Sequence, residues 1–316
     1  MEETKAKTKV KDARSGNKPG TVELIQSYLM IAYKVIGITI FVTIPLLWVF
    51  RYAFYKATGY GDQTFTGLAN LKRVFDFTDS SSLAFWKSVK NTFVFAISKL
   101  AVEIPLALVM AFLLSCKIKG RTFFRALYFM PSMLSMSVMG VIFTYLFAHQ
   151  SGVINNLLRA VGLKPVQWFS SGATAMFMIC AVSVWHNFGV YMLYFMTGLA
   201  NIDPTLYEAA TVDGASVKKQ FFKITIPLLA PVAQMVFMNA FLGSLKITDL
   251  VLTFTDGRPN KETEVMMTNI YKSFFQTAVG RKNYGYASAK CLVVAAILGI
   301  LTVIYLKLTN KSSNLD

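Results

Sequence analysis

The sequence has little charge, few histidines and few cysteines. Only 15% of its 316 residues are charged, whereas soluble domains carry about 25%. Apolar residues make up 54% of the chain, and its mean hydropathy is +0.49. Two histidines and three widely spaced cysteines supply neither a disulfide framework nor a metal site, so we expect buried structural thiols and no metal. This composition excludes disordered, collagen-like and disulfide-stabilised proteins and predicts an integral membrane protein.

Acidic residues are also scarce, with 16 Asp and Glu against 32 Lys and Arg. No basic segment is interleaved with stacking aromatics, so nucleic acid is not an expected partner. Basic residues next to membrane spans attract anionic lipid and mark cytoplasmic loops, which explains the charge more simply. The sequence also lacks a G-x-x-x-x-G-K-[ST] phosphate loop. We therefore expect a non-enzymatic chain, with no catalytic residue and no cofactor of its own.

Long apolar runs dominate the rest of the chain. Six of them are long enough to cross a bilayer about 30 Å thick as helices, which predicts an all-α membrane protein with six transmembrane helices. We expect a basic, disordered cytoplasmic tail over 1–27, a transmembrane domain over 28–310 and a second cytoplasmic tail over 311–316. The six predicted spans are 31–50, 91–115, 126–148, 173–200, 224–245 and 291–306.

The short loops predict the orientation of these spans. Lys117, Lys119, Arg121 and Arg125 crowd the link between the second and third spans, which marks that link as cytoplasmic. With six spans, both termini and the loop between the fourth and fifth spans then lie in the cytoplasm. The long loops 51–90 and 249–287 would be external. They carry eleven basic residues, but long loops have a weak influence on orientation.

The loop over 203–227 has a distinctive local pattern. Asp203 is a good helix N-cap, and Pro204 suits the first helical position because its missing N–H costs nothing there. Small apolar residues then recur at helical spacing, and Gly214 is suited to end the helix. A second helix is expected from Ser216 to Ile224. These residues predict a short amphipathic helix on the cytoplasmic surface, tied to two membrane spans.

The same loop carries a family resemblance. Glu208-Ala209-Ala210, Asp213-Gly214-Ala215 and the later Phe221, Ile224 and Pro227 resemble the EAA loop of binding-protein-dependent ABC importer permeases. The resemblance extends over about residues 85–308 and is closest to the carbohydrate branch, which includes the larger maltose permease subunit. Further segments that resemble this branch are 120–131, 152–158, 198–199 and 202–204.

This resemblance implies a six-helix permease with a coupling helix between the fourth and fifth spans. It implies a second homologous permease subunit, two ATP-binding subunits that hold ATP and Mg, and an extracellular solute-binding protein. The coupling helix would dock in a cleft of an ATP-binding subunit and transmit its closure to the spans. The residues expected at that contact are Tyr207, Glu208, Ala209, Ala210, Asp213 and Gly214.

Polar side chains inside the fourth and fifth spans are candidates for contacts with the transported solute. Polar groups in a helix bundle cost free energy unless they have partners, so their concentration in two consecutive spans is informative. Aromatic rings and amide or hydroxyl groups suit a sugar, although hydrogen bonds between helices would also explain each one. The candidates, several of which are also implied by the resemblance, are Ser183, Trp185, His186, Asn187, Tyr191, Asn239, Gly243 and Ser244.

One ion pair is expected inside the second span. Lys99 and Glu103 lie four residues apart and therefore share a helix face. Charges at bilayer depth usually pair and face the bundle interior, so a neutralising structural pair is favoured over a proton or ion relay.

We therefore predict a multi-pass permease of a bacterial cytoplasmic membrane that takes an oligosaccharide through a central cavity by alternating access. Two alternatives remain open. One is the same type of permease for another solute, such as a glycerol phosphate, which abundant Arg or Lys in the cavity would favour, although only Lys99 and Lys246 are available there. The other is an ion-coupled secondary carrier that uses the Lys99–Glu103 pair.

Overall fold

The computed structural model describes residues 21–57, 63–116, 118–276 and 283–313. By their internal contacts these fall into two compact units, which meet between Tyr52 and Ala53 in the sequence and are described separately. In the first unit, a π-helical turn joins two α-helices, and no residue of 26–52 is buried. Its elements are α2 (Thr21–Ile38), η1 (Thr39–Thr43) and α3 (Ile44–Tyr52).

The first helix begins earlier than the sequence predicts. Helix α2 begins at Thr21, within the range 1–27 that was expected to be a disordered tail. Val22, Leu24 and Ile25 already belong to the apolar sequence, which explains why a helix can begin before the most hydrophobic window. The apolar stretch 26–52 is long enough to cross a membrane. The remainder of the expected tail, 1–20, lies outside the described residues.

The second unit opens with a small hairpin, which lies within the loop 51–90. Strands β1 (Tyr55–Ala57) and β2 (Gln63–Phe65) pair antiparallel, with Tyr55 opposite Phe65. Helix α4 (Ala69–Val74) follows. The buried Asn70 amide donates to the backbone oxygens of Ala53 and Tyr55, at 3.0 and 2.9 Å, and so fixes α4 to the hairpin.

Helix α5 (Ser80–Ser115) is the longest element of the second unit. It begins eleven residues before the predicted span because Asp79 caps it, accepting a hydrogen bond from the Ser81 N–H at 2.8 Å. The Arg73 guanidinium, 2.6 Å from Asp79, holds the pKa of that carboxyl below its usual value.

Cys116 follows α5 and is exposed, so the expectation that all three cysteines are buried is wrong there; Cys180 and Cys291 are half-buried.

The predicted third span, 126–148, is not one straight helix. Helix α6 (Arg121–Phe129) and a 3₁₀ turn, η2 (Met130–Met133), are followed by α7 (Met136–Leu146) at a 96° bend. Leu134, between them, has an extended backbone. The chain also passes very close to a neighbouring helix here, because a Cβ on Gly189 would collide with the backbone oxygen of Tyr128.

The fifth span is also bent. The segments 217–228 and 230–245 meet at 65°, just after Pro227, so the predicted continuous helix over 224–245 is wrong in that respect. The last helix begins at Tyr284, about two turns before Cys291, as expected for a sixth span that starts a turn or two earlier. It continues to Ser313, into the range 311–316 that was expected as a tail. Residues 314–316 lie outside the described residues. The remaining helices are α8 (Val153–Ala160), α9 (Gly172–Ala200), α10 (Pro204–Val212), α11 (Val217–Gln220), η3 (Phe221–Thr225), α12 (Ile226–Leu228), α13 (Ala230–Leu245), α14 (Asp249–Phe254), α15 (Met266–Phe275) and α16 (Tyr284–Ser313).

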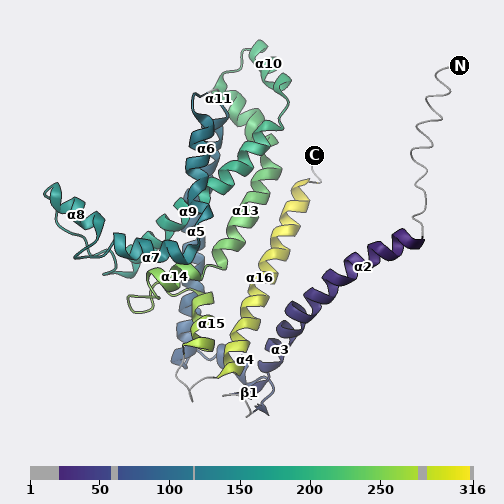
Figure 1. The fold of residues 1–316 in the computed structure, drawn as a ribbon, viewed down its shortest axis with the longest axis vertical. Coiled ribbons are helices and arrows are strands. Elements are labelled where there is room, and N and C mark those ends of the chain that lie inside the picture. Colours follow the sequence, from purple (N-terminus) through teal and green to yellow (C-terminus); the bar gives the residue numbers. More distant parts are fainter. Residues whose placement is uncertain (1–20, 58–62, 117, 277–282, 314–316) are drawn as a thin grey trace. The chain divides into compact units, whose positions relative to one another are not determined.

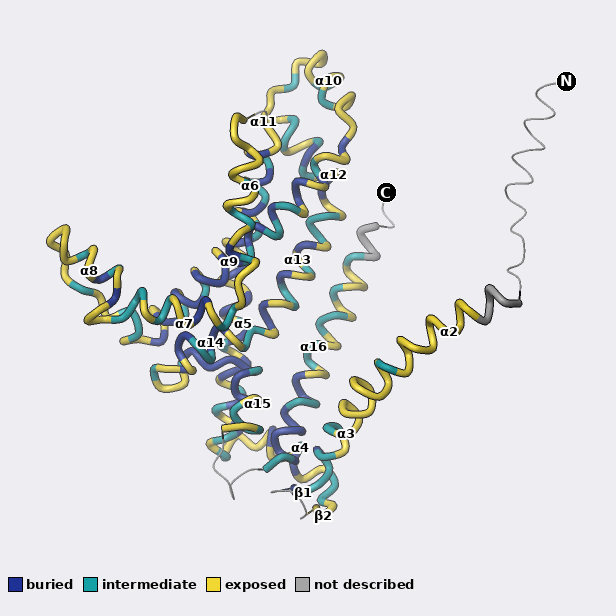
Figure 2. Tube along the Cα trace, in the orientation of Figure 1, coloured by how far each residue is buried: buried dark blue, intermediate teal, exposed yellow. Residues whose placement is uncertain are grey.

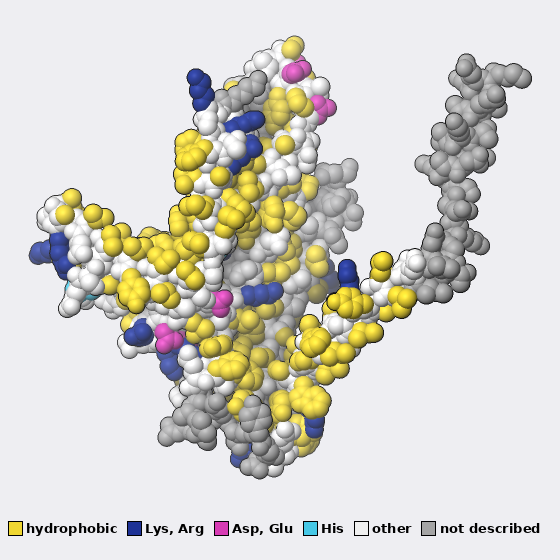
Figure 3. Space-filling view, in the orientation of Figure 1, with side chains coloured by type: hydrophobic (Ala, Val, Ile, Leu, Met, Phe, Trp, Pro, Cys, Tyr) yellow, Lys and Arg dark blue, Asp and Glu magenta, His cyan; other side chains and the backbone are white. Residues whose placement is uncertain are grey.

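The described residues hold four helices that are long and apolar enough to cross a membrane, or up to six if each bent pair forms one span. In the second unit, α10 and α11 lie at one end and α4, α15 and the hairpin at the other (Figure 1). The buried residues concentrate where α5, α9, α13 and α16 pack together (Figure 2). The visible outer surface is largely apolar (Figure 3), as a surface that faces lipid requires.

Candidate functional site

Helix α10 is built by the residues that predict it. The Asp203 side chain accepts a hydrogen bond from the Thr205 N–H at 2.9 Å, and this bond lowers the pKa of the Asp203 carboxyl. Pro204 occupies the first turn. Gly214 ends the segment with φ +74°, a left-handed conformation that strains any residue with a side chain. The Ser216 hydroxyl then accepts from the Lys219 N–H and starts α11.

Two side-chain contacts fix α10 to the elements that follow it. The hydroxyls of Tyr207 and Thr225 are 2.9 Å apart, and this hydrogen bond joins α10 to the π-helical segment η3. The Gln220 amide donates to the Thr211 hydroxyl at 3.0 Å and to the Ala215 backbone oxygen at 3.1 Å. Helix α10 is therefore connected by both the chain and its side chains to the segment that leads into α13.

The surface of this helical end is exposed. Of the six predicted coupling residues, only Tyr207 and Ala210 are half-buried, and Glu208, Ala209, Asp213 and Gly214 are exposed. Apolar side chains are exposed beside them: Val212 is 88% and Val217 is 71% accessible. Exposed apolar residues rimmed by polar ones are typical of a surface that another protein covers. Figure 2 shows that exposed residues predominate over α10 and α11.

A second candidate site is a cavity of about 230 Å³ inside the second unit. It brings together five of the eight predicted solute-binding residues, which come from α9 and α13. Ser183, Asn187 and Tyr191 follow one another at four-residue intervals on α9 and so share a helix face. The predicted residues that line this cavity are Ser183, Asn187, Tyr191, Gly243 and Ser244.

The polar groups of this cavity are held by neighbouring backbone. The Asn187 amide donates to the Ser183 backbone oxygen at 3.1 Å, and the Ser244 hydroxyl donates to the Ala240 oxygen at 2.6 Å. Gly243 leaves open space, because a Cβ there would have no atom within 4 Å. The cavity thus presents hydroxyl, amide and phenol groups with room beside them.

The buried ion pair lies against this cavity. The Lys99 ammonium is 3.3 Å from a Glu103 carboxylate oxygen, as the four-residue spacing predicts, and their side chains are 4% and 0% exposed. Lys99 lines the cavity and donates to the Ser244 hydroxyl at 3.3 Å. Lys99 therefore connects the polar groups of α13 to the pair on α5.

Three predicted residues lie elsewhere. Trp185 is 43% exposed and lies beside Phe143, with ring centroids 5.6 Å apart. His186 is buried and shares a hydrogen bond of 2.9 Å with the Leu134 backbone oxygen, which fixes the break between η2 and α7. Asn239 is exposed and donates to the Met235 oxygen of its own helix at 3.0 Å.

Other residues also line the cavity. Lys99 and Lys246 are predicted only as cations for an anionic solute, and Ile247 is implied only by the family resemblance. Phe95 and Met136 look like ordinary core residues, and Asp249 follows the predicted end of the fifth span, so little in the sequence indicates them. The cavity residues not among the eight candidates are Phe95, Lys99, Met136, Lys246, Ile247, Thr248, Asp249 and Leu250. Among the described residues, no group of three His, Cys, Asp or Glu side chains could hold a metal ion.

Comparison with known families gives the context of these two sites. Residues 103–311, about two-thirds of the chain, match the family model of the binding-protein-dependent transport system inner membrane component. The chain belongs to this family. Because its members are inner membrane components of transport systems, this permease is a multi-pass membrane protein and not an enzyme, as predicted.

Relatives of this permease cover most of its length. It is 29% identical to the arabinooligosaccharides transport system permease protein AraP of Bacillus subtilis (strain 168), over 90% of this chain and 88% of AraP. It is 32% identical to the multiple sugar-binding transport system permease protein MsmF of Streptococcus mutans serotype c, over 83% of this chain and 88% of MsmF.

A solved structure has the same fold. It is the crystal structure of a bacterial ABC transporter involved in the import of the acidic polysaccharide alginate. The similarity has a TM-score of 0.75 and covers 90% of this permease and 95% of that chain, with 21% identity. At this identity the similarity confirms the all-α permease fold and carries no further detail of the site.

Proposed function

We propose that this permease passes an oligosaccharide through the α5–α9–α13 cavity by alternating access. The observation that carries the proposal is the cavity itself, where an amide, two hydroxyls and a phenol surround the open space at Gly243. Groups of this kind read the hydroxyl pattern of a sugar. The names of AraP and MsmF, which refer to sugars, support the same substrate class.

The proposed partners follow from the family and from α10. A second homologous permease subunit and an extracellular solute-binding protein would complete the transport path, and two ATP-binding subunits that hold ATP and Mg would drive it. Helix α10 would dock on an ATP-binding subunit through Tyr207, Glu208, Ala209, Ala210, Asp213 and Gly214. Its exposed surface supports this role.

The proposed orientation has α10 and both termini in the cytoplasm of a bacterial cell. The links 118–120 and 201–223 lie at the α10 end of the second unit, whereas α4 and α15 lie at the opposite end (Figure 1). This arrangement agrees with the predicted sides of those loops, and the basic residues of the link between α5 and α6 support a cytoplasmic position for the α10 end.

A second solute class is favoured by one observation. Lys99 and Lys246 both line the cavity, and such cations suit an anionic solute such as a glycerol phosphate. Glu103 and Asp249 oppose these charges, so the cavity has no clear excess of positive charge, which favours the neutral sugar. Membership in a binding-protein-dependent family counts against the ion-coupled carrier.

The test is solute-stimulated ATP hydrolysis by the assembled transporter in proteoliposomes, with its binding protein present. Arabino- and malto-oligosaccharides and sn-glycerol 3-phosphate form the solute panel. We expect stimulation by an oligosaccharide and at least a tenfold loss of it in Asn187→Ala and Ser244→Ala. Asn239→Ala is the matched control and retains it, because Asn239 lies outside the cavity. Stimulation that survives both cavity changes would contradict the proposed site, and stimulation by the phosphate alone would contradict the sugar.

A further inference from the structure

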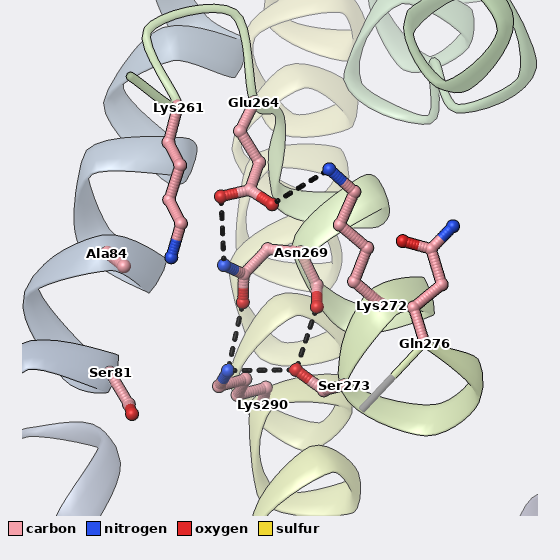
Figure 4. Close-up of a pocket in the computed structure, with 9 residues that line it drawn as sticks. All are labelled: Ser81, Ala84, Lys261, Glu264, Asn269, Lys272, Ser273, Gln276 and Lys290. Carbon is pink, nitrogen blue, oxygen red and sulfur yellow. Dashed lines mark hydrogen bonds and ion pairs between the residues drawn. The ribbon is translucent and has the colours of Figure 1, made fainter. Parts of the chain in front are cut away.

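A polar pocket lies at the end of the second unit opposite α10. Its volume is about 340 Å³, near the lower limit for pockets that bind small molecules. It is lined by the first turns of α5, by α15 and α16, and by the loop that precedes α15 (Figure 4). In the proposed orientation this end faces the cell exterior. The lining residues are Ser81, Ala84, Lys261, Glu264, Asn269, Lys272, Ser273, Gln276 and Lys290.

The carboxylates near this pocket, Glu264 and Asp256, already form ion pairs with Lys272. Glu264 is 3% exposed, and its oxygens lie 3.6 Å from the Lys272 ammonium and 3.4 Å from the Asn269 amide nitrogen that donates to it. Lys272 also pairs with Asp256 at 2.9 Å. Lys272 is therefore neutralised by two carboxylates.

The other two lysines have no carboxylate of their own. Lys290 is 4% exposed and donates to two neutral acceptors, the Asn269 amide oxygen at 2.9 Å and the Ser273 hydroxyl at 3.1 Å. Its ammonium also lies 4.6 Å from the Tyr286 ring centre. Among the described residues, neither Lys290 nor Lys261 has a carboxylate within 4 Å. The nearby Glu264 is already paired with Lys272, and a buried ammonium with no carboxylate in contact is costly, so an anion from outside the chain would stabilise Lys290 further.

The excess positive charge at this pocket indicates that its ligand carries a single negative charge. Three lysines face two carboxylates, Glu264 and Asp256, which leaves one positive charge in excess. Figure 4 shows the Lys261 side chain extending from its loop into the pocket beside Asn269, on the side where Lys290 lies. The amide of Asn269 and the hydroxyl of Ser273 add neutral polar groups to the same wall.

The loop that presents Lys261 is held in a fixed shape. The Asn91 amide donates to the backbone oxygens of Lys261 and Glu264, at 3.4 and 3.0 Å. Lys261 has φ +58°, a left-handed conformation that costs free energy for a residue with a side chain. Such a conformation persists only when its surroundings impose it, and Thr263 in the same loop is fully buried. The backbone that carries Lys261 is therefore fixed in place.

We infer that this pocket is a carboxylate-binding site formed by Lys261, Lys290 and the polar wall between them. The carboxylate comes either from an acidic side chain of an extracellular protein partner or from an acidic group on a solute. Neither source involves the α5–α9–α13 cavity, so the inference stands or fails separately from the proposed sugar path.

The test measures the melting temperature of the permease in lipid nanodiscs as sodium acetate, D-glucuronate or D-glucose is added, with chloride keeping the ionic strength constant. We expect a saturable rise with acetate and no rise with glucose. Lys261→Gln should raise the half-saturating concentration at least tenfold, and Lys261→Arg should restore it. Lys90→Gln, which removes an exposed lysine of α5 outside the pocket, is the matched control and leaves it unchanged.

Comparison of the two carboxylates identifies the source. If acetate and glucuronate have the same half-saturating concentration, the inference is supported and the carboxylate belongs to a protein side chain. If glucuronate binds at least tenfold more tightly than acetate, the inference is supported and the carboxylate belongs to an acidic solute. A rise that is the same for chloride and acetate overturns the inference. So does a rise that Lys261→Gln leaves intact. Lys261 is exposed and has no ion pair among the described residues, so its replacement tests binding without unfolding the chain.

Discussion

Replacement of Lys99 by methionine should destabilise the permease strongly. Lys99 and Glu103 are 4% and 0% exposed, and among the described residues neither Glu103 oxygen accepts a hydrogen bond. The ammonium at 3.3 Å is thus the compensation for a fully buried carboxylate. Removal of one partner of a buried pair costs about 3–5 kcal/mol, because the remaining charge stays buried alone.

This loss of unfolding free energy is measurable as a fall in the melting temperature of the permease in nanodiscs. At about 2–4 °C per kcal/mol for larger domains, it corresponds to a fall of about 6–20 °C for Lys99→Met. The double variant Lys99→Met/Glu103→Leu should recover to within about 3 °C of the original chain, since apolar replacement of a whole buried pair is often neutral. Lys246→Met, which removes an exposed lysine of the same cavity, is the control and should change the free energy of unfolding by less than about 0.5 kcal/mol.

Two results would refute this reasoning. If Lys99→Met melts at the same temperature as the original chain, Glu103 does not depend on Lys99. If the double variant is as unstable as the single one, the loss arises from packing or from the Ser244 hydrogen bond and not from an unpaired charge.

Three further predictions concern the coupling helix and two glycines. Glu208→Lys should lower recovery of the ATP-binding subunit in pull-downs at least tenfold while membrane insertion stays normal, because it reverses a charge on the exposed face of α10; unchanged recovery would count against docking there. Gly189→Val should cost about 1–3 kcal/mol of unfolding free energy, since its Cβ collides with the Tyr128 oxygen, and an unchanged melting temperature would show that α6 can move away. Gly243→Leu should leave yield and melting temperature near normal but abolish sugar-stimulated ATP hydrolysis, because its side chain enters open space in the cavity, and retained stimulation would mean that the solute takes another path.

The sequence predicts the helices well where hydropathy and capping agree. Asp203, Pro204 and Gly214 define α10 by local chemistry alone, and the structure has each in the expected role. The prediction fails where it rests on hydropathy alone. The break before α13 lies next to Pro231, which occupies the first turn of α13 and cannot continue a preceding helix, so the sequence did carry that signal. The break at Leu134 follows the segment in which Tyr128 approaches Gly189 closely, and hydropathy does not encode such a contact.

The residues that line the solute cavity were predictable only in part: five of the eight candidates line it. Ser183, Asn187 and Tyr191 share a helix face, so a correct choice of one implies the others. Trp185 and His186 lie at other angles around α9, and no single sequence shows which face of a span points into a cavity. The pocket at Lys290 could not be foreseen, because it joins residues of α5, α15 and α16 that lie up to about 210 positions apart in the chain, from Ser81 to Lys290.

One consequence follows from the length of α5. Ser81, at the outer pocket, and Lys99, at the central cavity, belong to the same uninterrupted stretch of helix, about 27 Å apart at 1.5 Å per residue. Proline enters that helix only at Pro105, beyond both positions. A rigid tilt of α5 would therefore move both positions together, so that a ligand held at the pocket near Ser81 would also affect the proposed solute cavity beside Lys99.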